Sequence, residues 1–334
     1  MSLQIIKSGL LDTIQDQGRY GYQHLGINPG GAMDRFSSQS GNALLGKDFN
    51  SPVIEIHFPA PIILFKKETI ICITGADFSP KINNKKISNN QPIAINKNTV
   101  LQFEKMLSGA RCYLTILHDP DLDKWLNSYS TNLVAGAGGF KGRALKKGDI
   151  LNFKNNFDCK YLAAEKDFEL LPWKATETVT SKKEIRFIKG SEWDWLIDDA
   201  LKIFVESNYK ILNNSNRMGY RLQGNTLKVK EEIQLISSGV TFGTIQLLPD
   251  GQLIVLMADH QTTGGYPRIG HVISTDLSLL AQCNPGDEIK FSSVELAIAE
   301  KELIQQQRGL QQMQTASKFK IEKLLSNIST PGGF

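Results

Sequence analysis

Residues 61–73 read Pro-Ile-Ile-Leu-Phe-Lys-Lys-Glu-Thr-Ile-Ile-Cys-Ile. Two runs rich in branched and aromatic residues flank a short charged turn, which is typical of consecutive β-strands. Comparable runs, bounded by Gly, Pro, Asn or Lys, recur at residues 111–117, 149–153, 184–188, 233–236, 253–257 and 288–291. Turn signals arrive roughly every 8–12 residues, as in sandwiches and barrels. The sequence therefore predicts a mainly β protein.

Helical patterns are few. Residues 33–45 place apolar side chains on one face and end before Gly46, a suitable C-terminal cap. A second helix is predicted at 276–282, with Asp276 as its N-cap, and a longer one at 294–317. The last five residues, 330–334, are expected to form a frayed tail.

A polar stretch at residues 176–183 separates apolar segments and marks a linker. With 334 residues the chain has room for about two domains. We therefore expect an N-terminal β domain at 1–178, a C-terminal β domain at 184–293, and a C-terminal helix and tail at 294–334.

Composition excludes several classes of function. The net charge of +4 is mild and no block of like charges occurs, so no nucleic-acid partner is expected. No apolar stretch is long enough to span a bilayer, and the N-terminus does not resemble a signal peptide. The four cysteines, Cys72, Cys112, Cys159 and Cys283, show no metal-binding spacing. We expect a cytoplasmic protein with reduced, mostly buried thiols and no metal.

Two glycine-rich segments are candidate binding loops. Residues 13–35 combine glycines with Asp16, Arg19, His24 and Asp34 and run into the first helix, where backbone N–H groups could hold an anion. A plain turn that caps the helix is the alternative. Residues 135–143 lack both the dinucleotide and the phosphate-loop spacing, so a flexible loop is the favoured interpretation.

The most informative segment is 253–267, where an apolar run ends in Asp259, His260, Gln261, Thr262 and Thr263 before two glycines. A buried strand holds its last residues rigidly, which suits catalytic placement. Asp259 could orient His260, and His260 could act as an acid or base from a surface cleft. A turn aspartate beside a surface histidine is the alternative.

Arginines at positions 217 and 221 lie in the block Ser-Asn-Arg-Met-Gly-Tyr-Arg. They could clamp a carboxylate or carbonate through two hydrogen bonds, or they could face solvent from a hairpin turn. No catalytic triad, zinc-protease motif or P-loop is present, which argues against a self-sufficient ATPase or hydrolase.

Several of these blocks, in order, resemble one family. They are residues 9–22, 31–34 (Gly-Ala-Met-Asp), 73–77, 138–145, 216–222, 243–246 (Gly-Thr-Ile-Gln) and 258–267 (Ala-Asp-His-Gln-Thr-Thr-Gly-Gly-Tyr-Pro). The chain is similar to the biotin-dependent carboxyltransferase family, also known as the allophanate hydrolase subunit 2 or KipA family. One departure is Gly30, where relatives usually carry Ser, which puts any role of a hydroxyl there in doubt.

The resemblance implies two cyclophilin-like β-barrel domains, a KipI-like (PxpB-like) partner subunit, and an active site completed by that partner. Within this family chemistry, His260, Arg217 and Gln246 are our hypothesis for the catalytic residues, because their side chains suit the stabilisation of developing negative charge. Our candidates for substrate binding are Asp259, Gln261, Thr262, Thr263, Tyr266, Arg19, His24, Asp34 and Arg143.

Three activities remain open. The first is the C-type subunit of an ATP-dependent 5-oxoprolinase, working with a KipI-like subunit and an A-type lactam hydrolase subunit and inactive alone. A lactam is a poor electrophile, so ATP must activate it and fixed donors must stabilise developing charge. The second is a regulatory protein that antagonises a KipI-like kinase inhibitor. The third is carboxyl transfer from biotin carried on another chain, since this chain has no Met-Lys-Met biotin-acceptor motif.

Overall fold

The computed structural model describes residues 2–154, 166–176, 183–231 and 234–329. Their contacts divide the chain into two compact units, each described here by itself. The first comprises Met1–Gly18, Arg35–Thr178 and Gln307–Phe334; the second comprises Arg19–Asp34 and Val179–Gln306. The segment 19–34 thus belongs with the C-terminal unit, although it lies early in the sequence. Most of the expected linker, residues 177–182, lies outside the described residues, as does the expected tail at 330–334.

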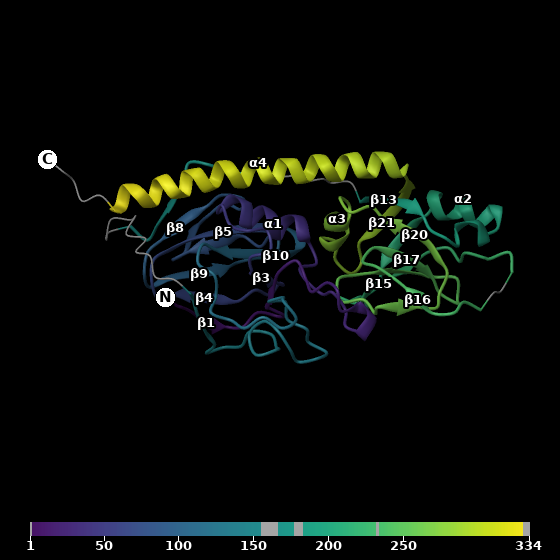
Figure 1. The fold of residues 1–334 in the computed structure, drawn as a ribbon, viewed down its shortest axis with the longest axis horizontal. Helices are drawn as coiled ribbons and strands as arrows, with labels where there is room; N and C mark the ends of the chain where they lie inside the picture. The colour runs from purple at the N-terminus through teal and green to yellow at the C-terminus, as the bar shows by residue number, and fades with distance from the viewer. Residues whose placement is uncertain (1, 155–165, 177–182, 232–233, 330–334) are drawn as a thin grey trace. The chain divides into compact units, whose positions relative to one another are not determined.

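The first unit contains two six-stranded sheets (Figure 1). One sheet has, in spatial order, β11 (Ile150–Asn152), β1 (Ser2–Lys7), β4 (Ile62–Phe65), β9 (Thr99–Phe103), β6 (Pro80–Ile82) and β7 (Lys85–Lys86). The other has β12 (Phe168–Leu170), β8 (Ile93–Ile95), β5 (Thr69–Asp77), β10 (Ser108–Ile116), β3 (Val53–Ile56) and β2 (Thr13–Gln15). The two strands expected from residues 61–73 are β4 and the first part of β5, one in each sheet.

The second unit is built on a closed seven-stranded barrel. Its strands, in order around the ring, are β13 (Glu184–Lys189), β20 (Arg268–Val272), β17 (Thr244–Leu247), β18 (Leu253–Leu256), β15 (Gly219–Gln223), β14 (Asn208–Ile211) and β21 (Glu288–Ser293). The ring closes through the parallel pair β13 and β21, while the other neighbours are antiparallel. Closure removes the exposed edges that an open sheet would leave.

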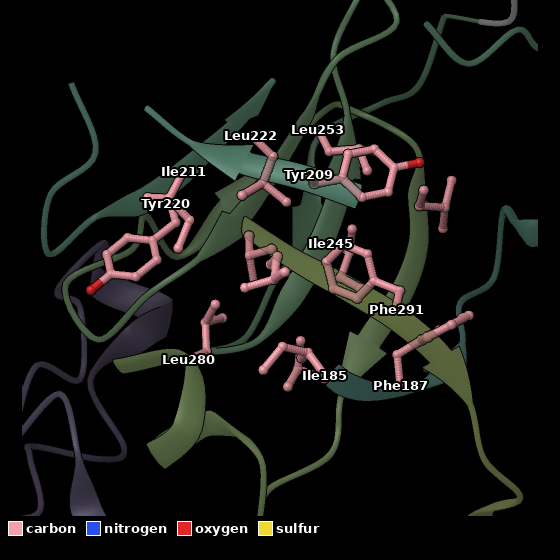
Figure 2. Close-up of a cluster of buried hydrophobic side chains, with 14 of the residues drawn as sticks. Ile185, Phe187, Tyr209, Ile211, Tyr220, Leu222, Ile245, Leu253, Leu280 and Phe291 are labelled. Carbon is pink, nitrogen blue, oxygen red and sulfur yellow. The ribbon is translucent and has the colours of Figure 1, made fainter. Parts of the chain in front are cut away.

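The barrel interior is filled by alternate residues of these strands, as the period of two requires. Figure 2 shows this cluster, with Ile185, Phe187, Tyr209, Ile245 and Phe291 among its members. Phe204 packs on Phe291 with ring centroids 5.0 Å apart and nearly parallel planes. The predicted core strand at 253–258 is confirmed, since every residue of that run except Ile254 is buried.

Helices are few, as predicted: α1 (Arg35–Leu44), α2 (Asp198–Glu206), α3 (Leu277–Ala281) and α4 (Leu296–Ser329), with short 3-10 turns at Gln23–Leu25 and Trp193–Trp195. The mainly β fold, with a barrel and a C-terminal helix, is confirmed. Three details differ from expectation. Helix α2 has no counterpart among the predicted helices, and α4 extends to Ser329 instead of 317. Residues 234–236 of the run at 233–236 do not form a strand, and residue 233 lies outside the described residues.

Asp276 occupies the N-cap position of α3, as predicted, but it does not act as a side-chain cap. Its side chain makes no capping hydrogen bond to α3. Instead its carboxylate accepts from the Arg186 backbone N–H (2.9 Å), Nε (2.9 Å) and Nη2 (2.7 Å). Arg186 also pairs with Glu302 of α4 at 2.7 Å. A charged, nearly bidentate partner outcompetes a single capping bond, because charge-assisted hydrogen bonds are stronger.

Cys72, Cys112 and Cys283 are buried free thiols, as expected, while Cys159 lies outside the described residues. Burial raises the pKa of the Cys72 and Cys112 thiols, which keeps them protonated and unreactive. Within the described part of the chain, no helix has the length and apolar character needed to cross a membrane.

Candidate functional site

A cavity of about 500 Å³ lies in the second unit. Strands β15, β18 and β17 contribute Gly219, Arg221, Ile254 and Gln246 to it. Because Tyr220, Leu222, Val255 and Ile245 fill the core, the cavity residues stand on the opposite, outer face of the barrel wall. The complete lining is Asn214, Asn216, Met218, Gly219, Arg221, Gln246, Leu248, Pro249, Asp250, Ile254, Gln261 and Tyr266. A volume of this size suits a small molecule, since ligand pockets span about 300–1,000 Å³.

Strand register places three of these side chains in one row. Arg221 pairs with Ile254 across β15 and β18, and Ile254 pairs with Gln246 across β18 and β17. Directly paired residues point to the same face of a sheet. The row therefore presents a guanidinium, an apolar surface and a carboxamide side by side. Gly219 leaves room for the Ile254 side chain, because a Cβ at 219 would lie 2.7 Å from Ile254 Cδ1.

Gln246 has an unusual environment. Its side chain is fully buried, and neither its Oε1 nor its Nε2 has a hydrogen-bond partner among the described residues. Gly264 covers it so closely that a Cβ at 264 would stand 2.6 Å from Gln246 Nε2. Buried amides are almost always paired, because an unmade hydrogen bond costs about 1–3 kcal/mol. Such a group in a cavity wall is a candidate ligand contact.

Asp259, at the end of the core strand, forms a buried ion pair with Arg217. Arg217 donates from Nε to Asp259 Oδ2 (2.7 Å) and from Nη2 to Oδ1 (3.0 Å), and Nη2 also donates to the Gly31 carbonyl (2.7 Å). Asn28 Nδ2 donates to the Asp259 carbonyl at 2.9 Å. These bonds fasten the segment 19–34 to the strand end. The sequence suggests that Asp259 orients His260, but in the structure both carboxylate oxygens of Asp259 accept from Arg217.

Gly30, the departure from the family pattern, lies against this ion pair. Its φ is +64°, in the left-handed region that favours glycine. A Cβ at this position would stand 3.0 Å from Arg19 Nη1 and 3.5 Å from Asp259 Oδ1. Arg19 is itself only 1% exposed. In this chain, glycine allows the buried Arg19 guanidinium to approach the backbone closely.

His260 is expected in a surface cleft, but its side chain is only 2% exposed. Its Nδ1 lies 2.5 Å from the Gln261 carbonyl oxygen. A carbonyl can only accept, so Nδ1 carries a proton and donates in this hydrogen bond. The expectation of an exposed histidine is wrong: a turn follows the strand, with the His260 N–H donating to the Met257 carbonyl at 3.0 Å, and the side chain is buried.

The other expected site residues are more dispersed. Gln261 and Tyr266 line the cavity, and Thr263 belongs to the short strand β19 (Thr263–Gly264), which Thr262 precedes. His24 is exposed on its 3-10 turn. In the second unit, Asp34 is buried and accepts a hydrogen bond from Gln282 Nε2 at 2.7 Å.

Arg143 belongs to the first unit, where it donates to Asp149 Oδ2 at 2.7 Å and to Oδ1 at 2.8 Å. The Arg143 hydrogen bond holds the pKa of the Asp149 carboxyl below its usual range. The residue before Arg143 must be glycine for the loop to fold back on itself, because a Cβ at Gly142 would lie 1.8 Å from the Gly136 carbonyl oxygen. Both observations suit a structural turn in residues 135–143.

Most residues of the cavity wall are not predicted from the sequence as site residues. The sequence identifies Arg221 as a possible anion clamp without placing it in the substrate-binding set, and it does not point to Ile254, Asn214 or Asp250. A usable signal exists, because residues 219, 221 and 223 alternate with the apolar Tyr220 and Leu222. No group of three or more His, Cys, Asp or Glu side chains in the described ranges is placed to hold a metal ion.

Comparison with known proteins identifies the same family that the sequence blocks of residues 9–267 resemble. The family described as carboxyltransferase domain, subdomain A and B, matches residues 25–293. This chain belongs to that family. Among curated relatives, the 5-oxoprolinase C subunit of Haemophilus influenzae is 36% identical, over 86% of this chain and 90% of the relative. The protein of the same name from Escherichia coli is 34% identical, over 93% of this chain and 97% of the relative.

Members of the family also occur inside longer chains. Urea amidolyase of Saccharomyces cerevisiae is 30% identical over 87% of this chain, which corresponds to only 16% of that enzyme. The solved Kluyveromyces lactis urea amidolyase has the same fold, with a TM-score of 0.85 and 27% identity over 93% of this chain and 20% of that chain. The carboxyltransferase fold is thus shared by free-standing subunits and by parts of multidomain enzymes.

Proposed function

We propose that this chain is the C subunit of an ATP-dependent 5-oxoprolinase, which opens the lactam of 5-oxoproline to give glutamate. The observation that carries the proposal is the match to two proteins named as 5-oxoprolinase C subunits over 90% and 97% of their lengths. The urea amidolyase match, in contrast, covers about a sixth of that enzyme. Both the name and the coverage favour a subunit of a larger assembly.

The cavity chemistry supports a small ligand that contains an amide and an acid. Its charged lining side chains are Arg221 and Asp250, and its wall includes the unpartnered Gln246 carboxamide. One guanidinium and one carboxylate form a poor donor set for a triphosphate, which needs several cations or backbone N–H groups. The residues of this cavity therefore do not fit ATP, and the proposal assigns ATP binding to the partner subunits.

The proposed partners are a KipI-like subunit and an A-type lactam hydrolase subunit. The word subunit in the relatives' names supports an assembly, and the family resemblance supplies the partner classes. We expect the KipI-like contact to bury on the order of 1,600 Å² or more, the usual size of a stable interface. Because the reaction consumes ATP, we place the complex in the cytoplasm.

A second function has specific support. The urea amidolyase and urea carboxylase neighbours share the fold at a TM-score of 0.85. Carboxyl transfer from biotin on another chain is therefore the alternative. The cavity alone does not separate the two functions, since biotin carries a cyclic urea whose hydrogen-bonding edge resembles that of a lactam.

The test is reconstitution. The chain is purified alone and together with a KipI-like and an A-type subunit from the same organism, and ATP hydrolysis and glutamate formation are measured with and without 5-oxoproline. We expect turnover that depends on 5-oxoproline and requires all three proteins. Turnover by the isolated chain that partners do not change would contradict the subunit role. Carboxylation of a substrate by added carboxybiotin, without activity on 5-oxoproline, would favour the alternative.

A further inference from the structure

The Gln246 carboxamide points away from the barrel core. Its neighbours Ile245 and Leu247 belong to the core cluster, so the strand period of two places Gln246 on the outer face, where it lines the cavity. The amide has neither solvent nor a hydrogen-bond partner within the described residues. A leucine there would avoid the cost of an unpaired amide, so the carboxamide is better explained by a partner that arrives from the cavity.

The Gln246 amide is covered by a small structural element. It is the short ladder between β16 (Ser238–Gly239) and β19, with two residue pairs. Ladders this short have little stability of their own. Flanking support comes from Val240 N–H donating to Thr262 O (3.1 Å) and from Arg268 Nη1 donating to Ser238 Oγ (2.9 Å). Displacement of this ladder would open Gln246 to a ligand in the cavity without disturbing the barrel strands.

A primary carboxamide can form a donor and an acceptor bond side by side. The complementary group presents an N–H and a C=O on one edge, which requires an amide in the cis geometry. Open-chain secondary amides are almost always trans, whereas a five-membered lactam or cyclic urea is held cis by its ring. A carboxylate can only accept, so it could satisfy Nε2 but not Oε1.

A second anchor lies in the same row. Arg221 and Gln246 flank Ile254 on neighbouring strands, which separates their Cα atoms by roughly 10 Å at the usual strand spacing. Arg221 is exposed, and no described carboxylate forms an ion pair with it. An exposed guanidinium that forms no ion pair with a described carboxylate is suited to bind the carboxylate of a small ligand whose ring rests on Ile254.

We propose that this cavity binds a cyclic cis-amide, with Gln246 pairing to its N–H and C=O edge and Arg221 binding a carboxylate on the same ligand. The inference deepens the proposed function and rests on it for the identity of the ligand, 5-oxoproline. The cyclic urea of biotin presents the same edge, and the experiment separates these two sources.

The experiment measures binding by calorimetry to the full chain, alone and in the reconstituted complex. The probes are 5-oxoproline, 2-pyrrolidinone, N-methyl-2-pyrrolidinone and biotin methyl ester. We expect 5-oxoproline to bind, 2-pyrrolidinone to bind more weakly because it lacks the carboxylate, and the N-methyl compound to lose binding because it cannot donate to Oε1. Gln246→Leu should weaken 5-oxoproline binding about tenfold or more, the scale of two lost hydrogen bonds. Arg221→Met should remove the advantage of 5-oxoproline over 2-pyrrolidinone.

Stability separates recognition from a structural role. Gln246→Leu replaces an unpaired buried amide with an apolar side chain of similar size, so the melting temperature should stay level or rise. Gln223→Leu is the matched control: Gln223 is exposed on the same face of β15 but does not line the cavity, and its loss should change neither binding nor melting.

Binding of biotin methyl ester with the same dependence on Gln246 would support cis-amide recognition while counting against the oxoprolinase function. If neither ligand binds to the chain or the complex, the inference is overturned. It is equally overturned if Gln246→Leu binds like the wild type, or if it loses binding only together with its fold. An inactive reconstituted complex that still binds 5-oxoproline through Gln246 would contradict the proposed function alone.

Discussion

Breaking the Arg217–Asp259 ion pair should be the most costly single change near the strand end. The two side chains are only 8% and 15% exposed, and two hydrogen bonds of 2.7 and 3.0 Å join them. Asp259→Ala removes both of these acceptors from a buried guanidinium that also donates to the Gly31 carbonyl. Removal of one partner from a buried pair typically costs about 3–5 kcal/mol. We take about 3 kcal/mol as the expected loss, since Asp259 retains some solvent contact.

The assay is urea unfolding at pH 7, followed by circular dichroism, for Asp259→Ala, Arg217→Met and the double variant. The double variant should lose less than the sum of the two single losses, by at least about 1 kcal/mol, because neither charge is then left alone. Glu169→Ala is the control: the exposed Lys166–Glu169 pair, 3.4 Å apart, should contribute less than about 1 kcal/mol. Additive losses in the double variant, or a loss at Asp259 no larger than at Glu169, would refute the reasoning.

Three further predictions concern single residues. His260→Ala should lower 5-oxoproline-dependent turnover of the assembled complex by about a hundredfold if the ring is an acid or base, and should also lower its melting temperature because the ring is 2% exposed; normal turnover would remove His260 from the site. Gly30→Ala should cost at least about 1–2 kcal/mol in urea unfolding, since φ is +64° and the new Cβ would meet Arg19 Nη1 at 3.0 Å; an unchanged midpoint would contradict this. Burial raises the pKa of the Asp12 carboxyl to about 7, so folding favours the protonated form. As the pH rises from 4 to 7, the unfolding free energy of the wild type should therefore fall by up to about 4 kcal/mol relative to Asp12→Asn. Parallel pH profiles of the two proteins would show that Asp12 does not titrate in this way.

The strands, the first helix and the C-terminal helix can be predicted because their signals are local. A run such as Leu253–Leu256 is apolar throughout, and α1 ends shortly before a glycine, so neighbouring residues alone indicate the structure. The strand-end cluster is recognisable in the same way, since polar residues directly follow a buried run. Helix α2 escapes prediction because its nine residues give a short periodic signal.

Register, pairing and burial depend on the tertiary structure. The row formed by Arg221, Ile254 and Gln246 requires three strands to align, and a shift of one residue would turn each side chain to the other face. Asp276 occupies the predicted N-cap position, but its carboxylate binds Arg186, which lies 90 residues away. His260 looks exposed after a turn, yet the fold buries it. Local sequence indicates most of the segments that form strands and helices, because those preferences depend on neighbouring residues. Which side chains meet is settled by the three-dimensional fold, because those contacts join residues far apart in the chain.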